Sequence, residues 1–223
     1  MYVMENQKNK KFQIKEPINA FTHFLGFLMS IPIMIILTMK AYQNASLLSV
    51  IAFLIFGISL LLLYGASTIY HTLNISQKGT ALLRRIDHMM IFVLIAGTYT
   101  PVCLIPLRGK WGWTLFIAVW GFAFAGILLK IFWLNAPRWF STLLYVVMGW
   151  LVLVAFVPLE RAIPIGGIVL LASGGIVYTI GAVIYAVKWS KLKLKYFGFH
   201  EIFHLFVMGG SALHVLFMFQ YVL

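Results

Sequence analysis

Acidic residues are scarce in this 223-residue sequence, which has five aspartates and glutamates against seventeen lysines and arginines. Charged residues of both signs make up only 10% of the chain and hydrophobic residues 62%, a balance outside the range of ordinary soluble domains. A basic excess of this size is typical of contact with nucleic acid, an anionic membrane face or an acidic ligand. The hydropathy selects the membrane and argues against a nucleic-acid partner.

Cysteine is almost absent as well. The single Cys103 excludes an intramolecular disulfide framework and is interpreted as a small buried hydrophobe. No cleavable signal is evident, because the basic N-terminus leads into an apolar run of spanning length without a small-residue cleavage pattern after it. We therefore expect a basic cytoplasmic segment over residues 1–15 and a single membrane domain over residues 16–223.

Seven apolar runs meet or approach the roughly 20 residues that a helix needs to cross a hydrocarbon core. They predict an all-α, integral membrane bundle of seven transmembrane helices. The runs are residues 18–39, 47–71, 87–107, 112–132, 139–158, 164–187 and 199–223. The sixth run is rich in glycine, which permits close approach between helices.

Basic residues of the connectors give the orientation, because such residues tend to stay on the cytoplasmic side. With the N-terminus inside, thirteen basic residues fall on that side and four fall outside. The inside set is Lys8, Lys10, Lys11, Lys15, Lys78, Arg84, Arg85, Lys130, Arg138, Lys188, Lys191, Lys193 and Lys195. The outside set is Lys40, Arg108, Lys110 and Arg161. The prediction is a cytoplasmic N-terminus and an external C-terminus.

Polar residues of the predicted spans gather at the cytoplasmic side. Ionisable groups are costly inside a membrane, so their presence indicates a functional site. This layer holds three of the five acidic residues and five of the six histidines. Its members are Glu16, Asn19, His23, Ser67, His71, Asp87, His88, His200, Glu201 and His204.

Spacing within this layer suggests a metal site. His200 and His204 are one helical turn apart, about 6 Å along the axis, and share a face, as do Ser67 and His71. Two imidazoles from one helix and a third from a neighbour would provide three nitrogen ligands and leave a fourth position for water, as in catalytic zinc sites. Asp87 could orient that water or accept its proton, and Ser67 could support the carboxylate or the water.

Each of these residues also has a purely structural interpretation. The three histidines could be buried and hydrogen-bonded to the backbone. Asp87 could be a carboxylate at a helix N-terminus, stabilised by the helix dipole and by Arg84 or Arg85. Ser67 could bond the carbonyl one turn before it in its own helix.

The stretch 200–204 also matches H-E-x-x-H, in which the glutamate of soluble metalloproteases is a general base. Five residues inside an apolar helix are weak evidence for a protease, and the chain shows no peptide-binding cleft. Glu201 lies about 100° around the helix from the adjacent His200 and therefore points in a different direction. The preferred interpretation is therefore a structural pairing with Lys195, Arg84 or Arg85.

The remaining polar residues are interpreted as structural. His23 and His88 are expected to make polar contacts rather than to bind metal. Glu16 and Asn19 precede or open the first helix and resemble a capping arrangement that packs against neighbouring loops. His214 lies about 15 Å further along the last helix than the H-x-x-x-H pair and is too far away to share its metal.

Four motifs together resemble the bacterial hemolysin III proteins of the progestin and adipoQ receptor family, within the superfamily that includes alkaline ceramidases. The motifs are EPINAFTHFLG (16–26), STIYH (67–71), RRIDHMMIFVLIAGTYTP (84–101) and HEIFHLF (200–206). The resemblance implies zinc near the cytoplasmic face, with His71, His200 and His204 as ligands, Asp87 holding the zinc-bound water and Ser67 supporting the site. Receptor relatives are associated with ceramide hydrolysis, and bacterial members with membrane-lipid homeostasis.

Taken together, these features suggest a zinc-dependent hydrolase that cleaves an amide or ester bond of a lipid in the bacterial cell membrane. One alternative is a non-enzymatic, receptor-like sensor of membrane state with structural zinc. Another is a pore-forming cytolysin, against which stand the seven nearly continuous apolar spans of a resident membrane protein. Membrane lipid is the expected substrate or ligand.

Overall fold

The computed structural model describes residues 13–44, 46–189 and 198–223. Within them the regular structure is helical, and seven helical segments are long and apolar enough to cross a membrane. The elements are α1 (Pro17–Asn44), α2 (Leu47–Thr72), α3 (Gln77–Leu104), α4 (Lys110–Phe132), α5 (Arg138–Gly149), η1 (Leu151–Ala155), α6 (Phe156–Ala162), α7 (Ile165–Val187), α8 (Phe199–Phe217) and η3 (Met218–Val222). The all-α prediction is confirmed, and the chain is a multi-pass membrane protein.

Short polar residues define where several helices begin. The Ser46 hydroxyl accepts a hydrogen bond from the Ser49 backbone N–H at 3.3 Å and caps α2. Ser76 caps α3 in the same way through the Gly79 N–H, also at 3.3 Å. Such caps satisfy amide groups that a helix leaves unbonded in its first turn.

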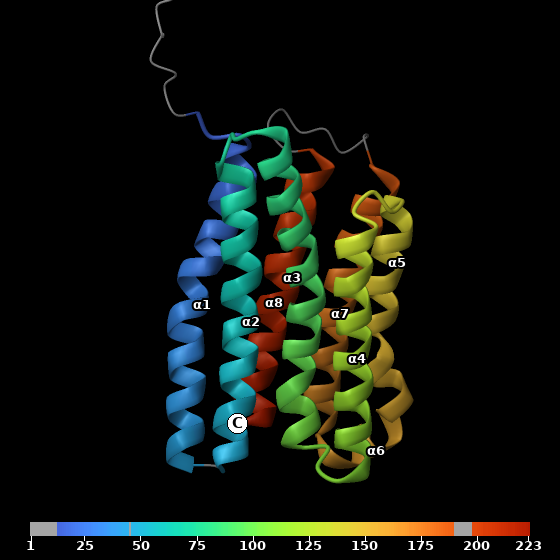
Figure 1. Cartoon of the computed structure of the whole chain (residues 1–223). Helices are drawn as coiled ribbons and strands as arrows, with labels where there is room; N and C mark the ends of the chain where they lie inside the picture. The colour runs from blue at the N-terminus through green and yellow to red at the C-terminus, as the bar shows by residue number, and fades with distance from the viewer. Residues whose placement is uncertain (1–12, 45, 190–197) are drawn as a thin grey trace, which may run out of the picture.

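The helices form an upright bundle, and in the view of Figure 1 α8 runs behind α2 and α3. Consecutive helices from α1 to α4 pack against one another, while α8 packs on both α7 and α1, and η3 reaches α3. The start of α8 therefore lies at the same end of the bundle as the start of α1 and the end of α2, at the top of Figure 1. This topology brings the predicted polar layer together. That this end of the bundle faces the cytoplasm remains a prediction. Residues 1–12 of the predicted basic segment lie outside the described residues.

The outer surface of the bundle is apolar. Large side chains such as Phe21 and Phe124 are 60% and 63% exposed, and many other aliphatic and aromatic residues are similarly uncovered. A soluble protein does not leave such an extended apolar surface in water. Hydrocarbon chains of a bilayer would cover it.

Glycines allow α7 and α8 to approach closely, as expected for the sixth span. A Cβ atom on Gly181 would lie 2.5 Å from the Phe206 Cβ, and one on Gly174 would lie 2.5 Å from the His214 ring. Larger residues at these positions would push the two helices apart.

The third helix begins earlier than predicted, at Gln77 rather than at residue 87. Its first turns carry Arg84 and Arg85, whose charges end the apolar run but not the helix, because the backbone hydrogen bonds continue past them. Asp87 consequently lies about three turns inside α3. It is therefore not a carboxylate at a helix N-terminus, which corrects that structural alternative.

The fifth span is also interrupted, although residues 139–158 were predicted as one continuous run. The Tyr99 hydroxyl of α3 donates to the Gly149 carbonyl at 2.7 Å and accepts from the Val152 N–H at 2.8 Å. A side chain inserted into the backbone ladder breaks a helix at that point. The span therefore continues as the 3₁₀-helix η1 and then as α6.

Candidate metal centre

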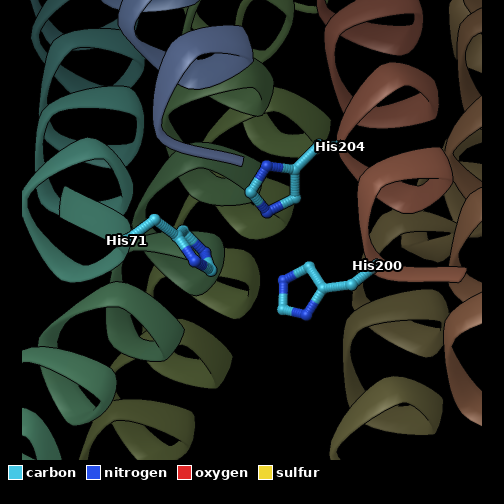
Figure 2. A group of neighbouring side chains, drawn as sticks. All are labelled: His71, His200 and His204. Atoms are coloured by element: carbon cyan, nitrogen blue, oxygen red, sulfur yellow. The ribbon is translucent and has the colours of Figure 1, made fainter. Parts of the chain in front are cut away.

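Three histidines from two helices converge at one end of the bundle. His71 lies in the last turn of α2, and His200 and His204 lie in the first two turns of α8. Their ring centroids are 4.8–5.1 Å apart. Figure 2 shows the three rings turned toward a common point, His71 from one side and the α8 pair from the other.

This group can hold a metal ion. One nitrogen from each ring lies within 4.8 Å of the other two, and His71 and His204 are buried. Ligand nitrogens around one zinc ion lie about 3.4 Å apart, so small ring rotations suffice. The Nε2 atom of His71 is buried and has no hydrogen-bond partner, which is costly unless a ligand occupies that position. The residues present thus fit a metal.

Glu16 orients His71. Its Oε2 atom lies 2.6 Å from His71 Nδ1, so this nitrogen donates to the carboxylate and Nε2 keeps its lone pair for a ligand. The hydrogen bond with His71 lowers the pKa of the Glu16 carboxyl to about 2, against the opposing effect of partial burial. A carboxylate behind a metal-binding imidazole fixes the ring and raises its basicity. The sequence pattern predicts a capping role for Glu16 at the start of the first helix and gives no sign of this contact with His71.

Asn19 extends the arrangement to α8. Its Nδ2 atom donates to Glu16 Oε2 at 3.1 Å and to Glu201 Oε1 at 2.9 Å. The other Glu201 oxygen accepts from the Gly198 N–H at 2.8 Å, at the start of α8. The chain of hydrogen bonds from His71 through Glu16 and Asn19 to Glu201 therefore connects α2 with α8, the two helices that carry the histidines.

Glu201 consequently has a structural role, as predicted, but with different partners. Both of its oxygens are engaged by Asn19 and by the first turn of its own helix. Among the described residues no salt bridge includes it, so Arg84 and Arg85 are not its partners, and Lys195 lies outside those residues. These contacts do not support the metalloprotease interpretation of H-E-x-x-H.

The other histidines lie around or below the triad. His23 stacks on His204 with ring centroids 3.6 Å apart and an interplanar angle of 9°. His88 lines the cavity described below. His214 Nδ1 donates to the Gly210 carbonyl at 2.7 Å, deeper in the bundle. None of the three belongs to the group that can hold a metal.

A cavity of about 710 Å³ opens beside the triad. Asp87 and Ser67, the two residues predicted to act on water, line it together with His200 and His204, and both are buried. The cavity continues to Trp150 and His214 in the middle of the bundle. Its size is that of a site for a small organic ligand or an acyl chain.

Comparison with known proteins agrees with these features. The family described as "Haemolysin-III related" matches residues 12–215, which include the three histidines, Asp87 and Ser67. The chain belongs to the haemolysin-III family. The expectation drawn from the four motifs is confirmed at this level.

Two bacterial members of the haemolysin-III family are similar over nearly their full length. "Hemolysin-3" of Bacillus cereus is 44% identical over 211 residues, covering 94% of this chain and 93% of the relative. "Hemolysin-3 homolog" of Bacillus subtilis (strain 168) is 45% identical over 202 residues, covering 90% and 92%. A more distant similarity, 21% over 235 residues, links the chain to 48% of the "Adiponectin receptor protein" of Drosophila melanogaster.

Proposed function

We propose that this haemolysin-III protein is a zinc-dependent hydrolase of an amide or ester bond in a membrane lipid, resident in the bacterial plasma membrane. The observation that carries the proposal is the juxtaposition of three convergent histidines, a buried carboxylate and a buried hydroxyl at one cavity among the helices. A ligand for this cavity enters from the bilayer, so no soluble substrate domain is needed.

Zinc suits three imidazole ligands with an open position. When bound, it would polarise the substrate carbonyl and lower the pKa of a coordinated water towards ~7. His71, held by Glu16, and the α8 pair supply the ligand nitrogens. Asp87 accepts the proton of the attacking water in this proposal, and Ser67 supports the carboxylate.

The test is the Asp87→Asn variant, which keeps the shape of the side chain and removes its basicity. Loss of a positioned general base lowers turnover by about 100-fold to 10,000-fold. We expect purified Asp87→Asn to retain one zinc per chain by elemental analysis and to lose hydrolysis of a short-chain ceramide and of a matched ester in micelles. Turnover at the wild-type rate in this variant would refute the role of Asp87.

A receptor-like function is the second candidate, favoured by the similarity to a protein named for adiponectin reception. In that case zinc would hold α2 and α8 together without catalysis. Wild-type protein with full zinc occupancy and no lipid hydrolysis would favour it.

The names of the Bacillus relatives favour a third candidate, a cytolysin. Leakage of dye from vesicles reconstituted with a variant lacking all three histidines would support a pore. Retention of the dye in the same vesicles would argue against a pore.

A further inference from the structure

Of the lysines that the structure describes, one is buried inside the bundle. Lys130, in the last turn of α4, is only 2% exposed, and its ammonium donates to the Ser141 hydroxyl of α5. An ammonium group has three donors, and a single neutral acceptor satisfies one of them. Burying a charge in this way is costly unless an anion accompanies it.

Two arginines that line the same cavity also have neutral partners. Arg84 of α3 donates to the Asn135 side-chain oxygen at 3.1 Å. Arg138 of α5 lies over the Tyr185 ring, 4.9 Å from its centroid. In the part of the chain that the structure describes, no carboxylate lies within 4.0 Å of either arginine or of Lys130.

The carboxylates of residues 13–44, 46–189 and 198–223 do not balance this charge. Among the described residues that line the cavity, Asp87 is the one acidic residue, against four basic ones, Arg84, Lys130, Arg138 and Lys188. Glu16 and Glu201 are engaged by His71 and Asn19. Glu160 lies in α6, at the opposite end of the bundle (Figure 1).

The preference of basic residues for the cytoplasmic side accounts for cations in connectors and at helix ends that reach water. It does not account for Lys130, whose side chain turns inward. An ammonium and two guanidinium groups around one cavity form a recognition site for an oxyanion, above all a phosphate.

We propose that the cavity binds an acyl lipid that carries a phosphate, with Lys130, Arg84 and Arg138 holding the phosphate and the acyl part extending toward Trp150. This inference deepens the proposed hydrolase by naming the class of its substrate and therefore rests on it. The phosphate lies at the same end of the bundle as the histidine triad, because α2 and α4 end there and α3, α5 and α8 begin there.

The experiment compares two ligands that differ only in the phosphate, dioctanoyl phosphatidate and dioctanoylglycerol. Trp139 and Trp150 line the cavity, so their fluorescence reports binding during titration of the purified protein in a neutral detergent. Hydrogen bonds to charged groups contribute a factor of about 10 to 100 in affinity. We expect wild type to prefer the phosphatidate by at least about tenfold.

Lys130→Met, a neutral replacement of similar length, should abolish this preference. Lys110→Met is the matched control, because Lys110 is an exposed lysine at the other end of the same helix. The control should keep the preference. Arg84→Gln repeats the test if Lys130→Met does not fold, and it should weaken phosphatidate binding by about tenfold.

Equal affinity of wild type for both ligands would overturn the inference, as would an unchanged preference in both Lys130→Met and Arg84→Gln. Inorganic phosphate that binds as tightly as the phosphatidate would also overturn it, by assigning the site to a soluble anion.

Zinc content and hydrolysis are measured on the same samples. Wild type that hydrolyses lipid but shows no preference for the phosphatidate would refute this inference alone, whereas a zinc-loaded wild type that hydrolyses nothing would refute the hydrolase.

Discussion

The bundle contains two groups of buried polar side chains that share α8 but differ in how well their hydrogen bonds are satisfied. In the middle of the bundle, Ser211 of α8 bonds the Tyr64 hydroxyl at 2.7 Å and the Tyr178 hydroxyl at 2.8 Å. His214, one turn away, is bonded to the Gly210 carbonyl. This group joins α2, α7 and α8, and each of these hydroxyls and the His214 Nδ1 atom has a partner.

The group at the end of the bundle is not complete. His71 Nε2 and both ring nitrogens of His23 are buried without a hydrogen-bond partner. Buried polar atoms are otherwise almost always satisfied. The comparison teaches that the complete network holds helices together, whereas the incomplete one leaves ring nitrogens that could hold a metal ion.

The largest expected effect comes from replacing, one at a time, a histidine of each group on the same helix, α8. His204→Ala removes one of the three proposed ligands and should reduce bound zinc from about one per chain to near zero, since two imidazoles bind a metal far more weakly than three. His214→Ala, ten residues further along α8, should leave the zinc content unchanged. Elemental analysis of both detergent-purified variants measures the effect.

Equal zinc content in the two variants would contradict the assignment. Zinc lost from His214→Ala alone would place the metal in the middle of the bundle. Both variants need a circular dichroism spectrum, which shows whether the helices are retained.

A smaller effect is expected from the carboxylate behind His71. Glu16→Gln keeps a hydrogen-bonding group but removes the charge that orients and strengthens the imidazole, and changes of this kind lower metal affinity by about 10-fold to 100-fold. Glu160→Gln, at an exposed position on the other end of the bundle, is the matched control. Competition with a zinc chelator measures the affinity, and equal values for the two variants would show that Glu16 does not act on the metal.

The sequence predicts the parts of this molecule that depend on spacing along one chain segment. Seven apolar runs correspond to seven candidate spans in the part of the chain that the structure describes, and the four-residue interval places His200 and His204 on one face. The same interval aligns Ser67 with His71 on α2. These predictions hold because helical geometry alone fixes which residues share a face.

Contacts that depend on how helices rotate against one another were not predictable. The hydrogen bond between Glu16, just before α1, and His71 joins two separate segments of the chain, and the stacking of His23 on His204 joins two helices. In the sequence, Lys130 is assigned to a connector, because a charged residue near the end of an apolar run is normally taken to mark the end of the membrane span. Packing against α5 buries it, and only the arrangement in space shows that.

The smallest expected effect tests the complete network. Tyr64→Phe removes one hydroxyl from the Tyr64–Ser211 bond, and hydrogen bonds between membrane helices contribute about 0.6 kcal/mol on average. We therefore expect the free energy of unfolding in micelles to fall by about that amount, with the zinc content unchanged, and Tyr178→Phe to behave alike. The Tyr64 ring also meets His23 edge-on at 5.1 Å, and His23 stacks on His204. A loss of zinc from Tyr64→Phe would thus show that the two groups are coupled through these rings, and the distinction between a structural network and a binding site would no longer hold.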